Sequence, residues 1–131
     1  MNKIRLIPLF LLLILYSCAD KVQENKYGIT LEQNKKWIVN HEMKPFIENG
    51  ETILREFIVA KDSNYIELAK SLNIENSKLI KSCTMEGQSH DELHKWLLPH
   101  MELLNELKTA TDLESASQTI QQLSASFEAY H

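Results

Sequence analysis

The sequence predicts an all-α protein, an up-down-up-down antiparallel four-helix bundle that follows a signal peptide and a flexible tether. From Asn34 onward, apolar and charged residues recur at helical spacing, and this stretch contains only two glycines and two prolines. No segment shows the alternation of β-branched residues that is typical of a strand. Four such helical segments are separated by short connections, which make sequential helices antiparallel neighbours.

The first 17 residues predict a signal peptide. Lys3 and Arg5 precede an apolar run over residues 6–15, and a run of about 10 residues is too short to cross a bilayer, which takes roughly 20. The segment Leu15-Tyr16-Ser17-Cys18 resembles the bacterial lipobox. That resemblance implies cleavage before Cys18, a diacylglyceryl group on its sulfur and acylation of the new amine. Two or three acyl chains would then hold the protein on the inner or the outer membrane, in the periplasm or at the cell surface.

Residues 18–33 are polar, contain Gly28 and lack a sustained period, so we expect a flexible tether there and one domain over residues 34–131. Lys3 and Arg5 leave with the signal, which takes the formal net charge from −4 to −6. An acidic surface of this kind repels phosphate backbones. Nucleic acid is therefore an unsuitable partner for the mature chain.

The first helix is expected from Asn34 to Ala60 and the second from Ser63 to Met85. Pro45 lies off the apolar stripe of the first helix and is expected to bend it. In the second helix, residues 73–76 are a candidate interruption, and Gly87 is the expected stop signal. The stripes predicted to face the core are Val39, Met43, Phe46, Ile47, Gly50, Ile53, Leu54, Phe57 and Ile58 in the first helix, and Ile66, Leu68, Leu72, Leu79, Ile80 and Cys83 in the second.

The third and fourth helices each open on a predicted capping box, in which a hydroxyl side chain and a glutamate three residues later bond each other's backbone amides. The two boxes are Ser89-His90-Asp91-Glu92 and Thr111-Asp112-Leu113-Glu114. Pro99 lies on the polar side of the third helix. The residues predicted to face the core are Leu93, Trp96, Leu97, Met101, Leu103, Leu104 and Leu107 in the third helix, and Leu113, Ala116, Ile120, Leu123, Phe127 and Tyr130 in the fourth.

Side chains able to bind a transition metal gather around the junction of the second and third helices: Cys83, Met85, His90, His94, His100 and Met101. His90 and His94 are four residues apart and share a helix face, so two imidazoles can meet one ion. Thiolate, thioether and imidazole together suit Cu(I), which makes copper the leading candidate.

Each of these residues also has a purely structural interpretation. Cys83 is the one cysteine left after lipidation, and a buried thiol that packs as a small apolar side chain is common. The His90 and His94 pair beside two acidic residues is typical of a solvated helix start. His100 lies within the apolar arc of its helix, where an imidazole needs a hydrogen-bond partner, a ligand or a metal.

A second set of candidate ligands comes from a family resemblance. The chain ends Phe127-Glu128-Ala129-Tyr130-His131, and Met43 lies on the core stripe of the first helix. This arrangement resembles the small periplasmic b-type cytochromes, four-helix bundles that hold haem between a methionine early in the first helix and a histidine near the end of the fourth. The resemblance implies haem as an alternative cofactor, with Met43 and His131 as its ligands.

The segment Cys83-Thr84-Met85-Glu86-Gly87, followed by residues 90–97, also resembles a segment of small bacterial lipoproteins that have no established activity. Three functional hypotheses follow. The first is a non-enzymatic envelope binding module with copper as its ligand, the second is a haem protein, and the third is a structural or interaction protein that meets another envelope component. An enzyme built on Cys83 with His90 or His94 is the least expected class.

Overall fold

The computed structural model describes residues 38–131, so the predicted signal peptide, Cys18 and the tether lie outside the described residues. Residues 38–131 form four helices and no strand. The helices are α1 (Lys44–Ala60), α2 (Tyr65–Lys81), α3 (Gln88–Thr109) and α4 (Leu113–Tyr130). The predicted all-α fold is confirmed.

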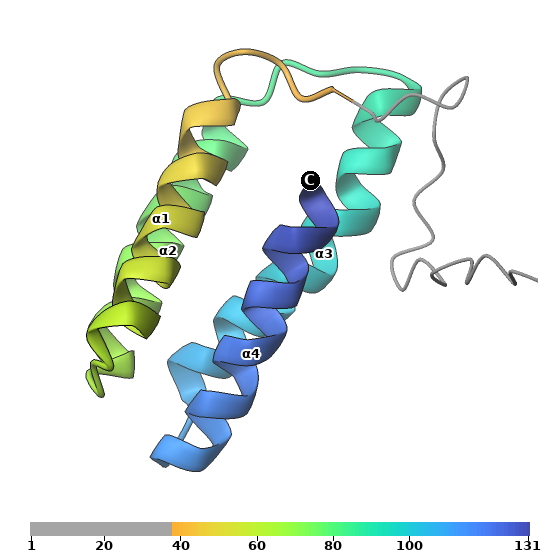
Figure 1. Cartoon of the computed structure of the whole chain (residues 1–131). Coiled ribbons are helices and arrows are strands. Elements are labelled where there is room, and N and C mark those ends of the chain that lie inside the picture. Colours follow the sequence, from red (N-terminus) through yellow and green to blue (C-terminus); the bar gives the residue numbers. More distant parts are fainter. Residues whose placement is uncertain (1–37) are drawn as a thin grey trace, which may run out of the picture.

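The helices alternate in direction, as Figure 1 shows. α1 and α2 form one hairpin, α3 and α4 form a second, and the connection from α2 to α3 crosses between them at the end where α1 begins. α4 also packs back on α1, over a smaller contact than those between sequential helices. None of the four helices has the length and apolar character needed to cross a membrane.

α1 begins about ten residues later than expected, because Pro45 starts the helix and does not bend it. Pro45 lies in the first turn of α1, where a missing backbone N–H costs nothing. The preceding residues form a turn in which the Met43 amide donates to the Asn40 carbonyl over 3.0 Å. Val39 and Met43 are nevertheless buried in the core, as their apolar spacing predicted.

The connection between α2 and α3 is longer than the sequence indicated. α2 runs without interruption through residues 73–76 but ends at Lys81, and Ser82 follows as its C-cap. Gly87 is the N-cap of α3 and not the stop of α2, with φ 70° and ψ −154°, a conformation that only glycine adopts readily. Residues 82–87 therefore span the gap between the two hairpins.

Neither predicted capping box forms as expected. Ser89 lies inside α3, and no side chain caps that helix; Glu92 is buried and its carboxylate accepts a hydrogen bond from Lys95 Nζ at 2.8 Å. In α4 the cap is one residue later than predicted: Asp112 Oδ1 accepts from the Ser115 amide at 2.8 Å. The box pattern located both helix starts to within a residue or two but assigned the wrong capping atoms.

The core is a single apolar cluster to which every helix contributes. Leu93, Trp96, Leu107 and Leu123 are fully buried within it. Several residues predicted to face this core are exposed instead, because the buried face of each helix is narrower than the apolar stripe in its sequence. These residues are Ile58, Ile66, Ile80, Met101 and Leu113.

The Asp112 cap of α4 and the absence of a side-chain cap on α3 can be tested directly. Asp112→Ala is expected to lower the free energy of unfolding by about 1 kcal/mol, because it removes the acceptor for the first amides of α4. Ser89→Ala is the matched control and is expected to leave stability nearly unchanged, since the Ser89 side chain caps no amide. Urea unfolding of both variants measures the difference, and equal losses would contradict the assignment of the caps.

Candidate functional site

His90 and His94 lie together on the first two turns of α3. Their ring centroids are 4.3 Å apart and their planes are inclined by 57°. His90 is half-buried and His94 is exposed, so solvent reaches the pair. Helical spacing brings the two rings onto one face, as the sequence predicted.

Cys83 and Met85 lie in the connection that precedes α3, and both pack, half-buried, against the edge of the core. Cys83 is a free thiol. The connection is fastened to the segment before α1, because Asn40 Nδ2 donates to the Ser82 carbonyl at 3.3 Å and to Thr84 Oγ1 at 3.2 Å. Among residues 38–131, no three side chains of the His, Cys, Asp and Glu types are grouped so as to hold a metal ion. The structure thus brings the two imidazoles together without adding Cys83 to them.

His100 lies inside the bundle and is engaged there. Its Nδ1 is 2.9 Å from Ser126 Oγ on α4, and Trp96 Nε1 donates to the Ser126 carbonyl at 2.7 Å. The imidazole stacks on the Trp96 ring at 4.8 Å, and the Phe127 ring meets it edge-on at the same centroid distance. Of the alternatives for a histidine in an apolar arc, the structure has the hydrogen-bonded core histidine.

Burial lowers the pKa of His100 from 6.5 to about 4, because the protonated ring would lose its hydration inside the core. The imidazole is therefore neutral near pH 7, and it shares its hydrogen bond with Ser126 as a neutral ring. Met101, the next residue, lies on the surface of α3. His100 and Met101 are therefore separate from His90 and His94, which lie at the start of the helix.

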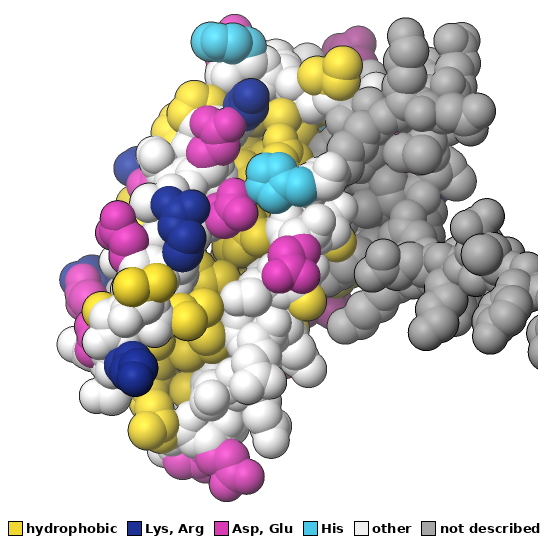
Figure 2. All heavy atoms as spheres, in the orientation of Figure 1, with side chains coloured by type: hydrophobic (Ala, Val, Ile, Leu, Met, Phe, Trp, Pro, Cys, Tyr) yellow, Lys and Arg dark blue, Asp and Glu magenta, His cyan; other side chains and the backbone are white. Residues whose placement is uncertain are grey.

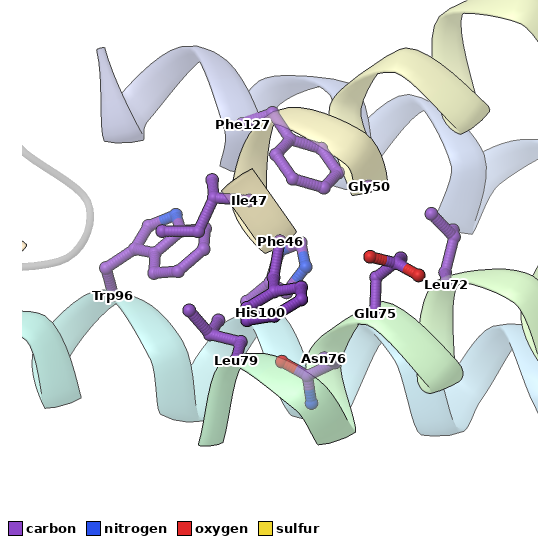
Figure 3. Close-up of a pocket in the computed structure, with 10 residues that line it drawn as sticks. All are labelled: Phe46, Ile47, Gly50, Leu72, Glu75, Asn76, Leu79, Trp96, His100 and Phe127. Carbon is purple, nitrogen blue, oxygen red and sulfur yellow. The ribbon is translucent and has the colours of Figure 1, made fainter. Parts of the chain in front are cut away.

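Figure 3 shows a small cavity beside His100, at the point where all four helices meet. Its volume is about 10 Å³, which is the size of one water molecule. The Glu75 carboxylate lines it and is bonded to Lys78 Nζ at 2.6 Å and to Asn49 Nδ2 at 3.3 Å. The lining side chains are Phe46, Ile47, Leu72, Glu75, Asn76, Leu79, Trp96, His100 and Phe127, with Gly50 completing the wall.

The two residues singled out as haem ligands lie in different surroundings. Met43 is fully buried at the start of α1. His131 is exposed at the end of α4, where its Nε2 lies 2.9 Å from Glu51 Oε2 on α1. That contact ties the end of α4 to α1 and gives His131 a partner of its own.

Two surface grooves were not anticipated from the sequence. The larger, of about 800 Å³, runs along the outer face of α2 to Lys108 of α3 and is lined by Ile66, Ala69, Lys70, Asn73, Ile74, Ser77, Lys78, Lys81 and Lys108. The smaller, of about 180 Å³, lies between α1 and α4 and is lined by Glu51, Leu54, Arg55, Ile58, Val59, Ser124, Phe127 and Glu128. Figure 2 shows the apolar strip on this face, between α1 and α4. The sequence pattern that corresponds to the larger groove is a second stripe along α2, in which isoleucines and lysines alternate at helical spacing.

Comparison of the chain with protein-family models, with curated proteins and with solved structures finds no match in any of the three.

The buried imidazole predicts a specific loss of stability in acid. The pKa of His100 is lower in the folded chain than in the unfolded one, so as the pH falls the unfolded chain takes up a proton first. This contribution to stability is complete above pH 6.5 and is lost as the pH falls to about 4, by about 3 kcal/mol in total. Glu75, the carboxylate that lines the same cavity, is kept in every variant that is compared.

His100→Gln keeps a group able to bond Ser126 but cannot titrate, so we expect it to flatten the fall in stability between pH 6.5 and 4. His41→Gln, at an exposed position, is the matched control and is expected to follow the wild-type curve. Urea unfolding across this pH range measures both. Parallel curves for the His100 variant and the wild type would refute the buried, neutral assignment.

Proposed function

We propose that the chain is a lipid-anchored, non-enzymatic binding module of the bacterial cell envelope, and that its ligand is a transition metal bound where α3 begins. The anchor rests on the charged, apolar and lipobox-like segments that end at Cys18. The observation that carries the binding role is the contact between the His90 and His94 rings at the exposed start of α3.

The location of the polar side chains supports a surface ligand over one inside the bundle. His100 and Trp96 are both bonded to Ser126, and the nearby cavity has room for one water molecule. His90 and His94, in contrast, reach solvent just after the connection that contains two sulfur side chains, Cys83 and Met85. Imidazole and sulfur ligands both favour late transition metals over hard cations such as Mg²⁺ and Ca²⁺.

A second candidate function is protein interaction through the groove along α2. Lys81 and Lys108 line this groove, and neither has an ion-pair partner among the described residues. Ile66 and Ile74 are exposed beside them. A basic, partly apolar groove on a chain of net charge −4 suits an acidic surface of another envelope protein.

The anchor predicts that Cys18→Ser moves the chain from the membrane fraction to the soluble fraction and abolishes its labelling by radioactive palmitate, because the acylated sulfur is lost. Cys83→Ser is the control, since that thiol lies in the folded domain. A Cys18 variant that still sediments with membranes and still carries the label would contradict lipidation at this residue.

The binding role predicts metal in the chain purified from its own envelope, measured by elemental analysis together with an absorption spectrum. The double variant Cys83→Ser, His94→Ala is expected to lose it, because it removes one imidazole of the pair together with one candidate sulfur ligand. The pair Ser77→Ala, His41→Ala is the control, with both changes at exposed positions outside α3 and outside the connection that precedes it. Metal content that survives the first double variant contradicts the site, and a chain that never contains metal favours the interaction role.

A further inference from the structure

The spacing of His90 and His94 on a helix restricts how the two rings can share an ion. Residues four apart have Cβ atoms about 5–6 Å from each other, on the same face and pointing the same way. If both rings bind through Nε2, a linear arrangement with the metal between them would need Cβ atoms roughly 12 Å apart, given metal–nitrogen bonds of about 2.1 Å. The pair therefore cannot supply two opposed Nε2 ligands to a two-coordinate Cu(I) ion.

The ring separation agrees with adjacent coordination positions. With metal–nitrogen bonds of about 2.1 Å and ring centroids about 1.1 Å behind each nitrogen, neighbouring ligands at 90° place the centroids about 4.5 Å apart. The tetrahedral angle places them about 5.2 Å apart and the linear arrangement about 6.4 Å. The observed 4.3 Å is nearest to the 90° arrangement.

The remaining positions around such an ion would have to come mostly from water. Among residues 38–131, no third His, Cys, Asp or Glu joins the two imidazoles in a group fit for a metal. Two imidazoles with water in the other positions suit a divalent ion of tetragonal geometry, and affinity for nitrogen ligands rises from Ni²⁺ to Cu²⁺ and falls again at Zn²⁺. Asp91, in the first turn of α3, supplies negative charge that offsets the positive end of the helix dipole.

We infer that His90 and His94 form a two-imidazole chelate for Cu²⁺, in adjacent coordination positions and without the Cys83 sulfur. The inference rests on the proposed function. It narrows the proposed metal from any transition metal to a divalent ion, and it narrows the candidate ligands from Cys83, Met85, His90 and His94 to the two histidines. Ni²⁺ and Zn²⁺ bind the same pair more weakly than Cu²⁺.

The test is calorimetric titration of the full chain in detergent with Cu²⁺ alone, near neutral pH. The Cys83→Ser background prevents oxidation of the thiol by Cu²⁺ and is expected to bind one equivalent. Adding His90→Ala or His94→Ala is expected to weaken binding at least tenfold. His41→Ala is the matched control, because it removes another exposed imidazole beside a carboxylate, and it is expected to leave the affinity unchanged.

Electron paramagnetic resonance of the bound Cu²⁺ adds a structural readout, with hyperfine coupling to two equivalent imidazole nitrogens expected. Undiminished Cu²⁺ binding in both histidine variants overturns the inference. Binding of Cu⁺ alone, lost in Cys83→Ser, also overturns it but leaves the proposed function standing, since a thiolate site is then present. A wild-type chain that binds neither oxidation state removes the inference and the metal-binding role together.

Discussion

The hydrogen bond between His100 and Ser126 is the contact on which the arrangement of the bundle depends. It joins α3 to α4 inside an apolar core, over 2.9 Å, and Trp96 adds a second bond to the same serine. A buried polar group without a partner costs about 1–3 kcal/mol. Any sliding of α4 along α3 would break both bonds at once, so the pair fixes the register of these helices.

The same cluster sets the position of α1. Phe127 meets the His100 ring edge-on and lies so close to Gly50 that a Cβ there would be 3.2 Å from the end of its ring. Glycine at this position lets α1 approach α4 where the contact between them is otherwise small. The interior is thus occupied by packed apolar side chains and a few polar groups, among them Asn76 Oδ1, which is buried beside the cavity without a hydrogen-bond partner among the described residues. The proposed ligand site lies instead on the surface, at the start of α3.

The fold and part of the candidate site followed from local patterns. The number and order of the helices were predictable, and so were most of their ends, because apolar spacing and helix-start residues are local signals; the start of α1 and the end of α2 were predicted wrongly. The burial of His100 and its need for a partner were also predictable. The identity of that partner was not, because Ser126 lies between Ala125 and Phe127 on a different helix and nothing local marks it as buried.

The errors have physical causes of the same kind. Pro45 is compatible both with a bend and with a first turn, and only the burial of Met43 in a preceding turn decides between them. Ile66 fits an apolar stripe but lies about 180° around α2 from buried Glu75. Whether Cys83 joins the histidines depends on the path of residues 82–87, which no helical periodicity specifies.

The central claim is that His100 belongs to the core of the bundle, whereas His90 and His94 bind a ligand from outside. The most direct measurement is a nitrogen-15 spectrum of the histidine side chains in the full chain, recorded without metal between pH 4 and 6.5 and, near neutral pH, with and without Zn²⁺. We expect His100 to keep one neutral tautomer until the pH approaches 4 and to be unaffected by Zn²⁺, and the ring nitrogens of His90 and His94 to shift together when Zn²⁺ is added. Protonation of the His100 ring near pH 6.5, or a Zn²⁺ shift at His100 and not at the pair, would contradict the account.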